Sequence, residues 1–282
     1  MSGAQAAVLI AFGVLAALAV GSFTCVVIDR MPLALAEPNE FGDLYDTRPW
    51  REVVGGQSRC SSCGAPIRAV DKIPVVSWFL LRGRCSGCEE RIPGFHPFVE
   101  LAVPVVAVLV AWGTGWDWRL LPALWLVPVA VAISVIDMRT FIVPTRIVWP
   151  AFAVSIALSV VAALVAHEPN WLLNGLVGLA VLAGPLFVIW FVMPSGMGFG
   201  DVRLTVLLGW TVGFVIGAER LSGTVLVTVL TLTIAAVVGL VFGVLVLGVR
   251  GRHARVPFGP ALAAAALIVI ALAEPIRSAF DL

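Results

Sequence analysis

Long apolar runs separated by short polar breaks dominate this chain of 282 residues. Most runs approach or exceed the roughly 20 residues that a helix needs to cross a bilayer. Prolines inside several runs do not exclude such helices, because neighbouring helices in a membrane satisfy the freed backbone groups. The pattern predicts an all-α polytopic membrane protein with about eight transmembrane helices, at about 6–28, 98–113, 119–136, 146–166, 172–193, 203–218, 221–249 and 259–274.

Residues 29–97 break the apolar pattern. This segment carries nine basic residues, nine acidic residues and four of the five cysteines. We therefore expect three parts: a first transmembrane helix (1–28), a polar insertion outside the membrane (29–97) and a membrane domain (98–282).

The distribution of positive charge predicts the orientation. If the N-terminus faces outward, the inward segments hold 15 of the 18 Lys and Arg residues, and only Arg119, Arg220 and Arg277 face outward. Because Lys and Arg accumulate on the cytoplasmic side of membrane proteins, the insertion is expected in the cytoplasm.

The overall composition limits the possible partners. Hydrophobic residues make up 60% of the chain, charged residues make up 12%, and the formal net charge is +1. The lipid bilayer is therefore an expected partner. The sequence has no basic tail for a nucleic acid, so none is expected.

The insertion carries two Cys-x-x-Cys pairs, with 21 residues between them. Two such pairs can supply four thiolates to one tetrahedral zinc ion. Two disulfides or one redox pair are the alternatives. A reducing cytoplasm argues against disulfides, and a redox pair normally needs only one Cys-x-x-Cys. The sequence favours a structural zinc site at Cys60, Cys63, Cys85 and Cys88, whereas Cys25 in the first helix is expected to pack as a small apolar residue.

Two aspartates stand out at the expected cytoplasmic ends of apolar runs. Asp201 follows Gly198 and Gly200 in a Gly-x-Gly-Asp sequence, and Asp137 follows the run at 119–136. A carboxylate inside a membrane is costly and marks a functional site by default. Two acids at one depth could activate a water molecule and polarise a peptide carbonyl. The alternatives are that Asp201 lies in a solvated loop and that Asp137 pairs with Arg139.

Several motifs occur together in the order found in one known family. The chain resembles the prepilin peptidases, also called type IV leader peptidases, which are membrane aspartyl proteases and N-methyltransferases. The resemblance covers nearly the whole chain. Besides the cysteine pairs, the matching motifs are an N-terminal block at 21–32, an Asp-x-Ile-Pro-x-x-Ser-Trp segment beginning at Asp71, the Gly-x-Gly-Asp motif, and a Val-Pro-Phe-Gly-Pro turn at 256–260.

The resemblance implies an activity and its components. Asp137 and Asp201 would be the catalytic residues, supported by the motif glycines Gly198 and Gly200, although the acid and the base cannot be told apart. The substrates would be prepilin or pseudopilin precursors of type IV pilus and secretion systems. Their leaders would be cut at the cytoplasmic face of the inner membrane. S-adenosylmethionine would then donate a methyl group to the new N-terminus.

Three positions depart from the family pattern. Cys25 stands where the family often has Asn, Thr145 where it often has Asp, and Arg203 where it usually has Lys. Because Cys25 lies in the N-terminal block, a leader peptidase without methyltransferase activity stays an alternative. A membrane transporter with a structural zinc loop is a second alternative, since intramembrane acids also relay protons.

Overall fold

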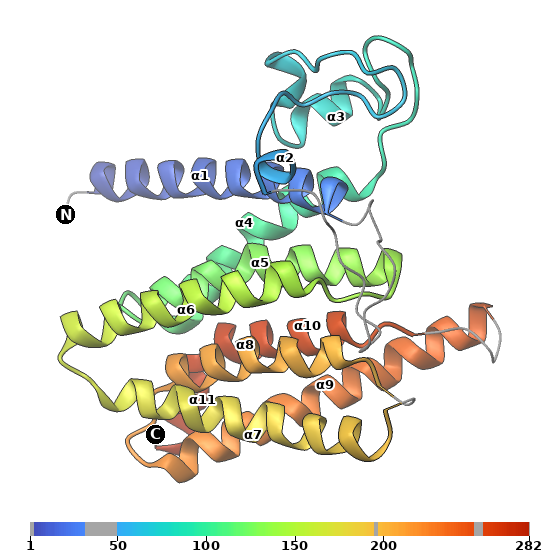
Figure 1. Ribbon diagram of the computed structural model, residues 1–282. Helices are drawn as coiled ribbons and strands as arrows, with labels where there is room; N and C mark the ends of the chain where they lie inside the picture. Colours follow the sequence, from blue (N-terminus) through green and yellow to red (C-terminus); the bar gives the residue numbers. More distant parts are fainter. Residues whose placement is uncertain (1–2, 32–49, 195–196, 251–255, 282) are drawn as a thin grey trace. The chain divides into compact units, whose positions relative to one another are not determined.

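The computed structural model describes residues 3–31, 50–194, 197–250 and 256–281, which form helices joined by turns and two isolated β-bridges (Figure 1). The chain divides into two compact units, unit 1 (Met1–Val105) and unit 2 (Val106–Leu282). The boundary falls inside helix α4 (Phe95–Thr114).

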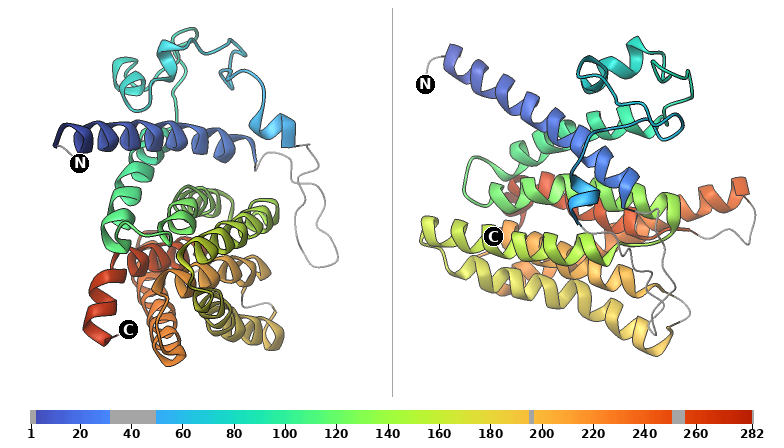
Figure 2. Two further views of the ribbon diagram at one scale, coloured as in Figure 1. Left: turned by 90° about the vertical axis from the view of Figure 1, so that its left-hand side faces the viewer. Right: turned by 45° about the horizontal axis from the view of Figure 1, so that its top comes forward.

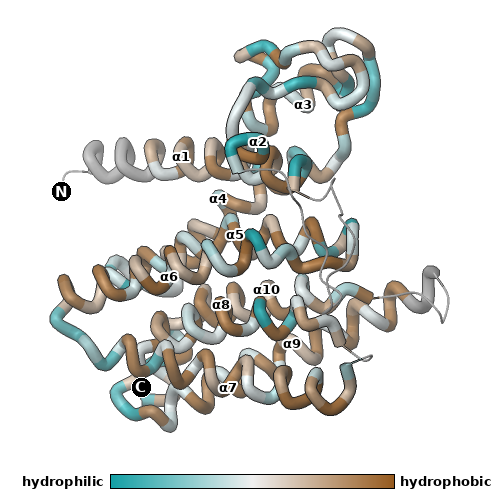
Figure 3. The backbone as a smooth tube through the Cα atoms, in the orientation of Figure 1, coloured by the Kyte–Doolittle hydropathy of each residue, from teal (hydrophilic) through white to brown (hydrophobic). Residues whose placement is uncertain are grey.

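Seven helices in the described part of the chain are long and apolar enough to cross a membrane. A bent pair, α10 (Gly259–Ala271) and α11 (Ala273–Phe280), would make eight if its two helices, inclined at 65°, form one broken span. Figure 3 shows apolar residues along the long helices of unit 2, whereas the short α11 is much less apolar than those helices. The prediction of an all-α polytopic protein with about eight spans is confirmed. The other spans are α1 (Gly3–Arg30), α4, α5 (Leu120–Thr140), α6 (Thr145–Ala166), α7 (Asn170–Val192), α8 (Phe199–Ile216) and α9 (Leu221–Arg250).

Unit 1 joins α1 to the polar insertion and to the first half of α4. Three short helices lie in the insertion: α2 (Trp50–Val54), η1 (Val70–Lys72) and α3 (Val76–Leu80). The Arg30 side chain at the end of α1 donates hydrogen bonds to the carbonyl groups of Val53 in α2 and of Gly55 just beyond it. A basic group at a helix C-terminus also complements the helix dipole.

Helices α1 and α4 approach each other closely at Gly21. A Cβ atom at this position would lie 3.0 Å from Glu100 Cα, so a side chain larger than hydrogen would push the helices apart. The Glu100 carboxylate also accepts the backbone N–H of Val75 at 2.6 Å. Val75 has a φ of 64°, which is unusual for a β-branched residue and needs such a contact to hold it. The hydrogen bond from Val75 to Glu100 thus holds the residue before α3 against α4.

Helix α8 forms the centre of unit 2, although it is the least hydrophobic of the seven spans. Of its residues, 78% are buried, compared with 11% for the span in α9, and α5, α6, α7, α9 and α10 all pack against it. Figure 2 shows the helices of unit 2 gathered into one bundle. The burial follows from small and hydroxyl side chains, which favour close helix packing in membranes.

Glycines bring α7 and α8 into backbone contact. A Cβ atom at Gly178 would lie 2.3 Å from the carbonyl oxygen of Gly209, and one at Gly213 would lie 2.3 Å from that of Asn174. Hydroxyl groups join α8 to α6, since Trp210 Nε1 donates to Ser159 Oγ at 3.1 Å. These contacts hold α8 rigidly, and with it the aspartate in its first turn.

Candidate active site

Asp137 lies in the last turn of α5 and is buried, with 4% of its surface exposed. The helix ends directly afterwards, because Phe141 adopts a left-handed conformation and its N–H bonds to the Asp137 carbonyl at 2.8 Å. The side-chain Oδ2 accepts the backbone N–H of Gly259 at 3.0 Å. Asp137 therefore faces the first residue of α10, and the alternative in which its carboxylate pairs with Arg139 is not seen among the ion pairs of the described residues.

Asp201 is the third residue of α8 and is half-buried. Gly198 precedes the helix with an extended backbone, and the helix begins at Phe199. In the described part of the chain, no N–H or side chain donates a hydrogen bond to the Asp201 carboxylate. The acid lies at the N-terminus of a buried helix, where the dipole favours a negative charge. It does not lie in a solvated loop.

Val143 connects the surroundings of the two aspartates. This buried residue lies between α5 and α6. A Cβ atom at Gly200 would lie 2.9 Å from Val143 Cβ, and a Cβ atom at Gly259 would lie 3.5 Å from Val143 Cγ2. Because Gly200 precedes Asp201 and Gly259 bonds to Asp137, the end of α5 and the start of α8 meet here.

Replacing Gly200 by Ala should disturb this junction. The added methyl would lie inside contact distance of Val143 Cβ, so we expect a loss of about 1–3 kcal/mol of stability and weaker activity. Unfolding in detergent measures the loss. Gly184→Ala is the matched control, since a Cβ there meets nothing within 4 Å. Val143→Gly should recover part of the loss in a double-mutant cycle. An unchanged unfolding temperature for Gly200→Ala would contradict the prediction.

Two of the residues that depart from the family pattern contact each other. The buried Arg203 guanidinium donates a hydrogen bond to Thr145 Oγ1 and lies 4.7 Å from the centroid of the Phe199 ring. The Arg–Thr pair joins the helix of Asp201 to the first residue of α6.

The four cysteines of the insertion come together in unit 1. Their sulfur atoms all lie within 4.8 Å of one another, and Cys60 Sγ is 3.8 Å from Cys88 Sγ. Zinc–sulfur bonds of about 2.3 Å in a tetrahedron require sulfur atoms roughly 3.8 Å apart, so the donor set fits zinc. The predicted grouping of Cys60, Cys63, Cys85 and Cys88 is confirmed, and all four cysteines are free thiols rather than disulfides.

The two cysteine turns share one backbone design. In each turn the residue four positions after the first cysteine donates its N–H to that cysteine's carbonyl, from Gly64 to Cys60 at 3.0 Å and from Glu89 to Cys85 at 3.0 Å. Both donors adopt positive φ. Backbone N–H groups of Cys63 and then Ser62 lower the pKa of the Cys60 thiol to about 6. This shift favours the thiolate, the form that binds metal.

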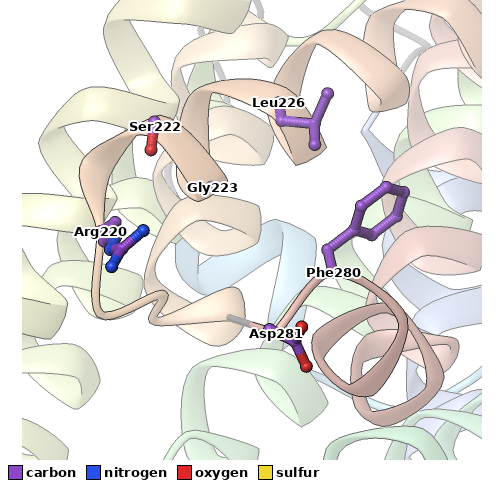
Figure 4. A pocket seen from close by; sticks show the side chains of 6 residues that line it. All are labelled: Arg220, Ser222, Gly223, Leu226, Phe280 and Asp281. Atoms are coloured by element: carbon purple, nitrogen blue, oxygen red, sulfur yellow. The ribbon is translucent and has the colours of Figure 1, made fainter.

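One pocket in unit 2 lies away from the aspartates. Figure 4 shows it between the start of α9 and the end of α11. Asp201 lies in the first turn of α8, and α9 starts just beyond the other end of α8, so the pocket and Asp201 lie at opposite ends of that helix. The pocket is lined by Arg220, Ser222, Gly223, Leu226, Phe280 and Asp281.

Gly259, Val143 and Thr145 were not predicted to surround the aspartates. Gly259 lies in the Val-Pro-Phe-Gly-Pro turn, so its motif was visible in the sequence. No sequence pattern, however, indicated which acid it would contact, because 122 residues separate it from Asp137. Val143 gave no signal, since an apolar residue between two helices is common in any membrane protein.

The fold and the site together define a class of protein. Unit 2 is a polytopic membrane domain with two aspartates brought together from different helices, and unit 1 carries a four-cysteine cluster. A pair of aspartates in this arrangement is typical of a membrane aspartic protease.

Comparison with known sequences identifies the family. Residues 15–114 match the Bacterial Peptidase A24 N-terminal domain, and residues 124–244 match the Type IV leader peptidase family. Similar proteins named prepilin leader peptidase/N-methyltransferase include one from Pseudomonas putida (33% identity, 90% of this chain and 87% of that protein) and one from Stutzerimonas stutzeri (31%, 93% and 90%). The chain belongs to the type IV leader peptidase family. No solved structure matches it significantly.

Proposed function

We propose that this protein is a prepilin leader peptidase that also methylates the new N-terminus of its product. One observation carries the peptidase proposal: Asp137 and Asp201, from different helices, reach one junction around Val143. Family membership supports the same conclusion, because the relatives are named for both activities. The substrates would be precursors of type IV pilins or pseudopilins.

The proposed reaction is direct hydrolysis by a water molecule held between Asp137 and Asp201. One carboxylate removes a proton from the water, and the other, still protonated, polarises the scissile carbonyl. Two close carboxylates suit these roles because they do not readily ionise together. No covalent intermediate is needed. The half-buried setting of Asp201 would strengthen electrostatic interactions with the substrate by excluding bulk water.

The proposed location is the cytoplasmic face of the inner membrane. The seven or eight apolar spans support a multi-pass membrane protein. The excess of Lys and Arg in the inward segments supports a cytoplasmic insertion at 29–97 and a cytoplasm-facing aspartate pair. The apolar stem of the precursor would remain in the bilayer next to the membrane domain 98–282, with its leader at the surface.

Cys60, Cys63, Cys85 and Cys88 would hold a zinc ion, whose role would be to order the insertion. Their closely grouped sulfur atoms support this assignment. S-adenosylmethionine would supply the methyl group, as the names of the relatives indicate. No described cluster of residues identifies where this donor would bind, so the methylation rests on the family alone.

Purified protein and a full-length prepilin provide the test. We expect mass spectrometry to detect loss of the leader, followed by a mass increase of one methyl group when S-adenosylmethionine is added. Cleavage without the added mass would indicate the alternative, a leader peptidase without methyltransferase activity. An intact precursor, under conditions where a characterised relative cleaves it, would contradict the proposed function.

A further inference from the structure

The contact between Asp137 and Gly259 makes the two aspartates unequal. Gly259 is the first residue of α10, and its N–H points to Asp137 Oδ2 at 3.0 Å. Pro260 follows and has no N–H, so Gly259 supplies the leading donor of this helix terminus. Asp137 thus caps α10 from a different helix. A carboxylate oxygen accepts such a bond best when it is ionised.

Asp201 has no comparable partner in the described part of the chain. It lies in the first turn of its own helix, so the dipole of α8 favours its charge to some degree. A direct hydrogen bond from a backbone N–H is stronger and more specific than this dipole effect. The difference between the two acids therefore favours the negative charge on Asp137 and the shared proton on Asp201.

We infer that Gly259 is a positioning residue that holds Asp137 as the general base and leaves Asp201 as the general acid. This inference rests on the proposed peptidase function. In the reaction, Asp137 takes a proton from the water as the water oxygen bonds to the carbonyl carbon, and Asp201 gives its proton to the carbonyl oxygen. When the C–N bond breaks, Asp137 protonates the leaving amine, and one hydroxyl proton returns to Asp201. Both acids end in their starting states.

Few charged groups lie on the described helices that pack against α5. Helices α6, α8 and α10 pack against α5. They contribute Arg146 from α6, and Asp201 and Arg203 from α8, whereas α10 carries no titratable side chain. Arg139 lies on α5 itself. Neither aspartate forms an ion pair with any described residue, so the bond from Gly259 is the specific interaction that distinguishes them.

Gly259→Ala tests the inference. The added Cβ would lie 2.7 Å from Asp137 Oδ2, so it would displace the carboxylate from the N–H. The acid limb of the kcat/KM profile reports deprotonation of the general base. The hydrogen bond from Gly259 favours the ionised form of Asp137, so losing it should move the midpoint of this limb to higher pH by about one unit. The value of kcat should also fall. The alkaline limb should stay in place.

Two other outcomes would overturn the inference. If the contact between Gly259 and Asp137 only stabilises the fold, Gly259→Ala should have lower activity with both limbs of its pH profile unchanged. If Asp201 is instead the base and Asp137 the acid, the alkaline limb of Gly259→Ala should move. Gly184→Ala is the control for a helix glycine, and its profile should match that of the wild type. Absence of cleavage by the wild-type protein would instead count against the proposed function.

A second measurement does not depend on activity. In Asp201→Asn, infrared titration of the carboxyl band follows Asp137 without its acidic neighbour. We expect the Asp137 midpoint to be higher in Asp201→Asn with Gly259→Ala than in Asp201→Asn alone. Equal midpoints in two folded variants would overturn the inference. If Gly259→Ala does not fold, adding Val143→Ala removes the methyl 3.5 Å from the new Cβ and leaves the displaced Asp137 carboxylate more room.

Discussion

Asp137→Asn and Asp201→Asn should each lower prepilin cleavage by at least about 10³-fold, because each removes one of the two groups that move protons in the proposed reaction. Asn is close in size to Asp, so the packing around Val143 and the bond from Gly259 can persist. The loss would therefore arise from chemistry. Initial rates of leader removal, measured by gel or mass spectrometry, give the comparison.

Asp117 provides the matched control for the aspartate variants. It pairs with Arg119 just before α5 begins, at the other end of that helix from Asp137. Asp117→Asn should cleave prepilin at a rate near that of the wild type. Membrane insertion and detergent unfolding should be similar for all three variants. Wild-type cleavage by either Asp137→Asn or Asp201→Asn would contradict the mechanism.

Replacing any one of the four clustered cysteines by Ser should remove zinc from the protein and loosen the insertion. Structural zinc sites contribute on the order of 10 kcal/mol of folding free energy in small domains, and three thiolates form a much weaker site. We expect about one zinc ion per chain in the wild type and almost none in Cys63→Ser. Metal analysis and limited proteolysis between residues 57 and 94 provide the two measurements.

Cys25→Ser separates the metal cluster from the fifth cysteine. The Cys25 thiol is buried in α1 and donates to the His96 carbonyl at 3.6 Å, in the same unit but outside the cluster. This variant should keep its zinc and its resistance to protease. Treating the wild-type protein with a strong chelator should remove its zinc and its protease resistance, as Cys63→Ser does. Full zinc content in Cys63→Ser would exclude the four-thiolate site.

The sequence alone was sufficient to predict the membrane class and the grouping of the cysteines. Apolar length sets the number of spans, because the bilayer has a nearly fixed thickness. Two Cys-x-x-Cys turns predict one tetrahedral site, because the spacing within each turn already brings two sulfur atoms together. Both properties depend on residues near each other in the chain, where spacing determines geometry.

The sequence also marked Asp137 and Asp201 as unusual, because charge is costly inside an apolar segment. It could not show that α8, the least hydrophobic span, would be the most buried. Hydropathy describes how a helix meets lipid, whereas glycine and hydroxyl contacts decide which helix lies at the centre of a bundle.

The inequality between the aspartates depends on tertiary structure. Gly259 reaches Asp137 across 122 residues of chain, and Val143 joins the two acidic turns only after α5, α8 and α10 have packed. A hydrogen bond of 3.0 Å depends on the relative placement of whole helices, which no local pattern encodes. The sequence thus determined which groups could react, and the packing of the helices decided which of them would be held as the ionised acid.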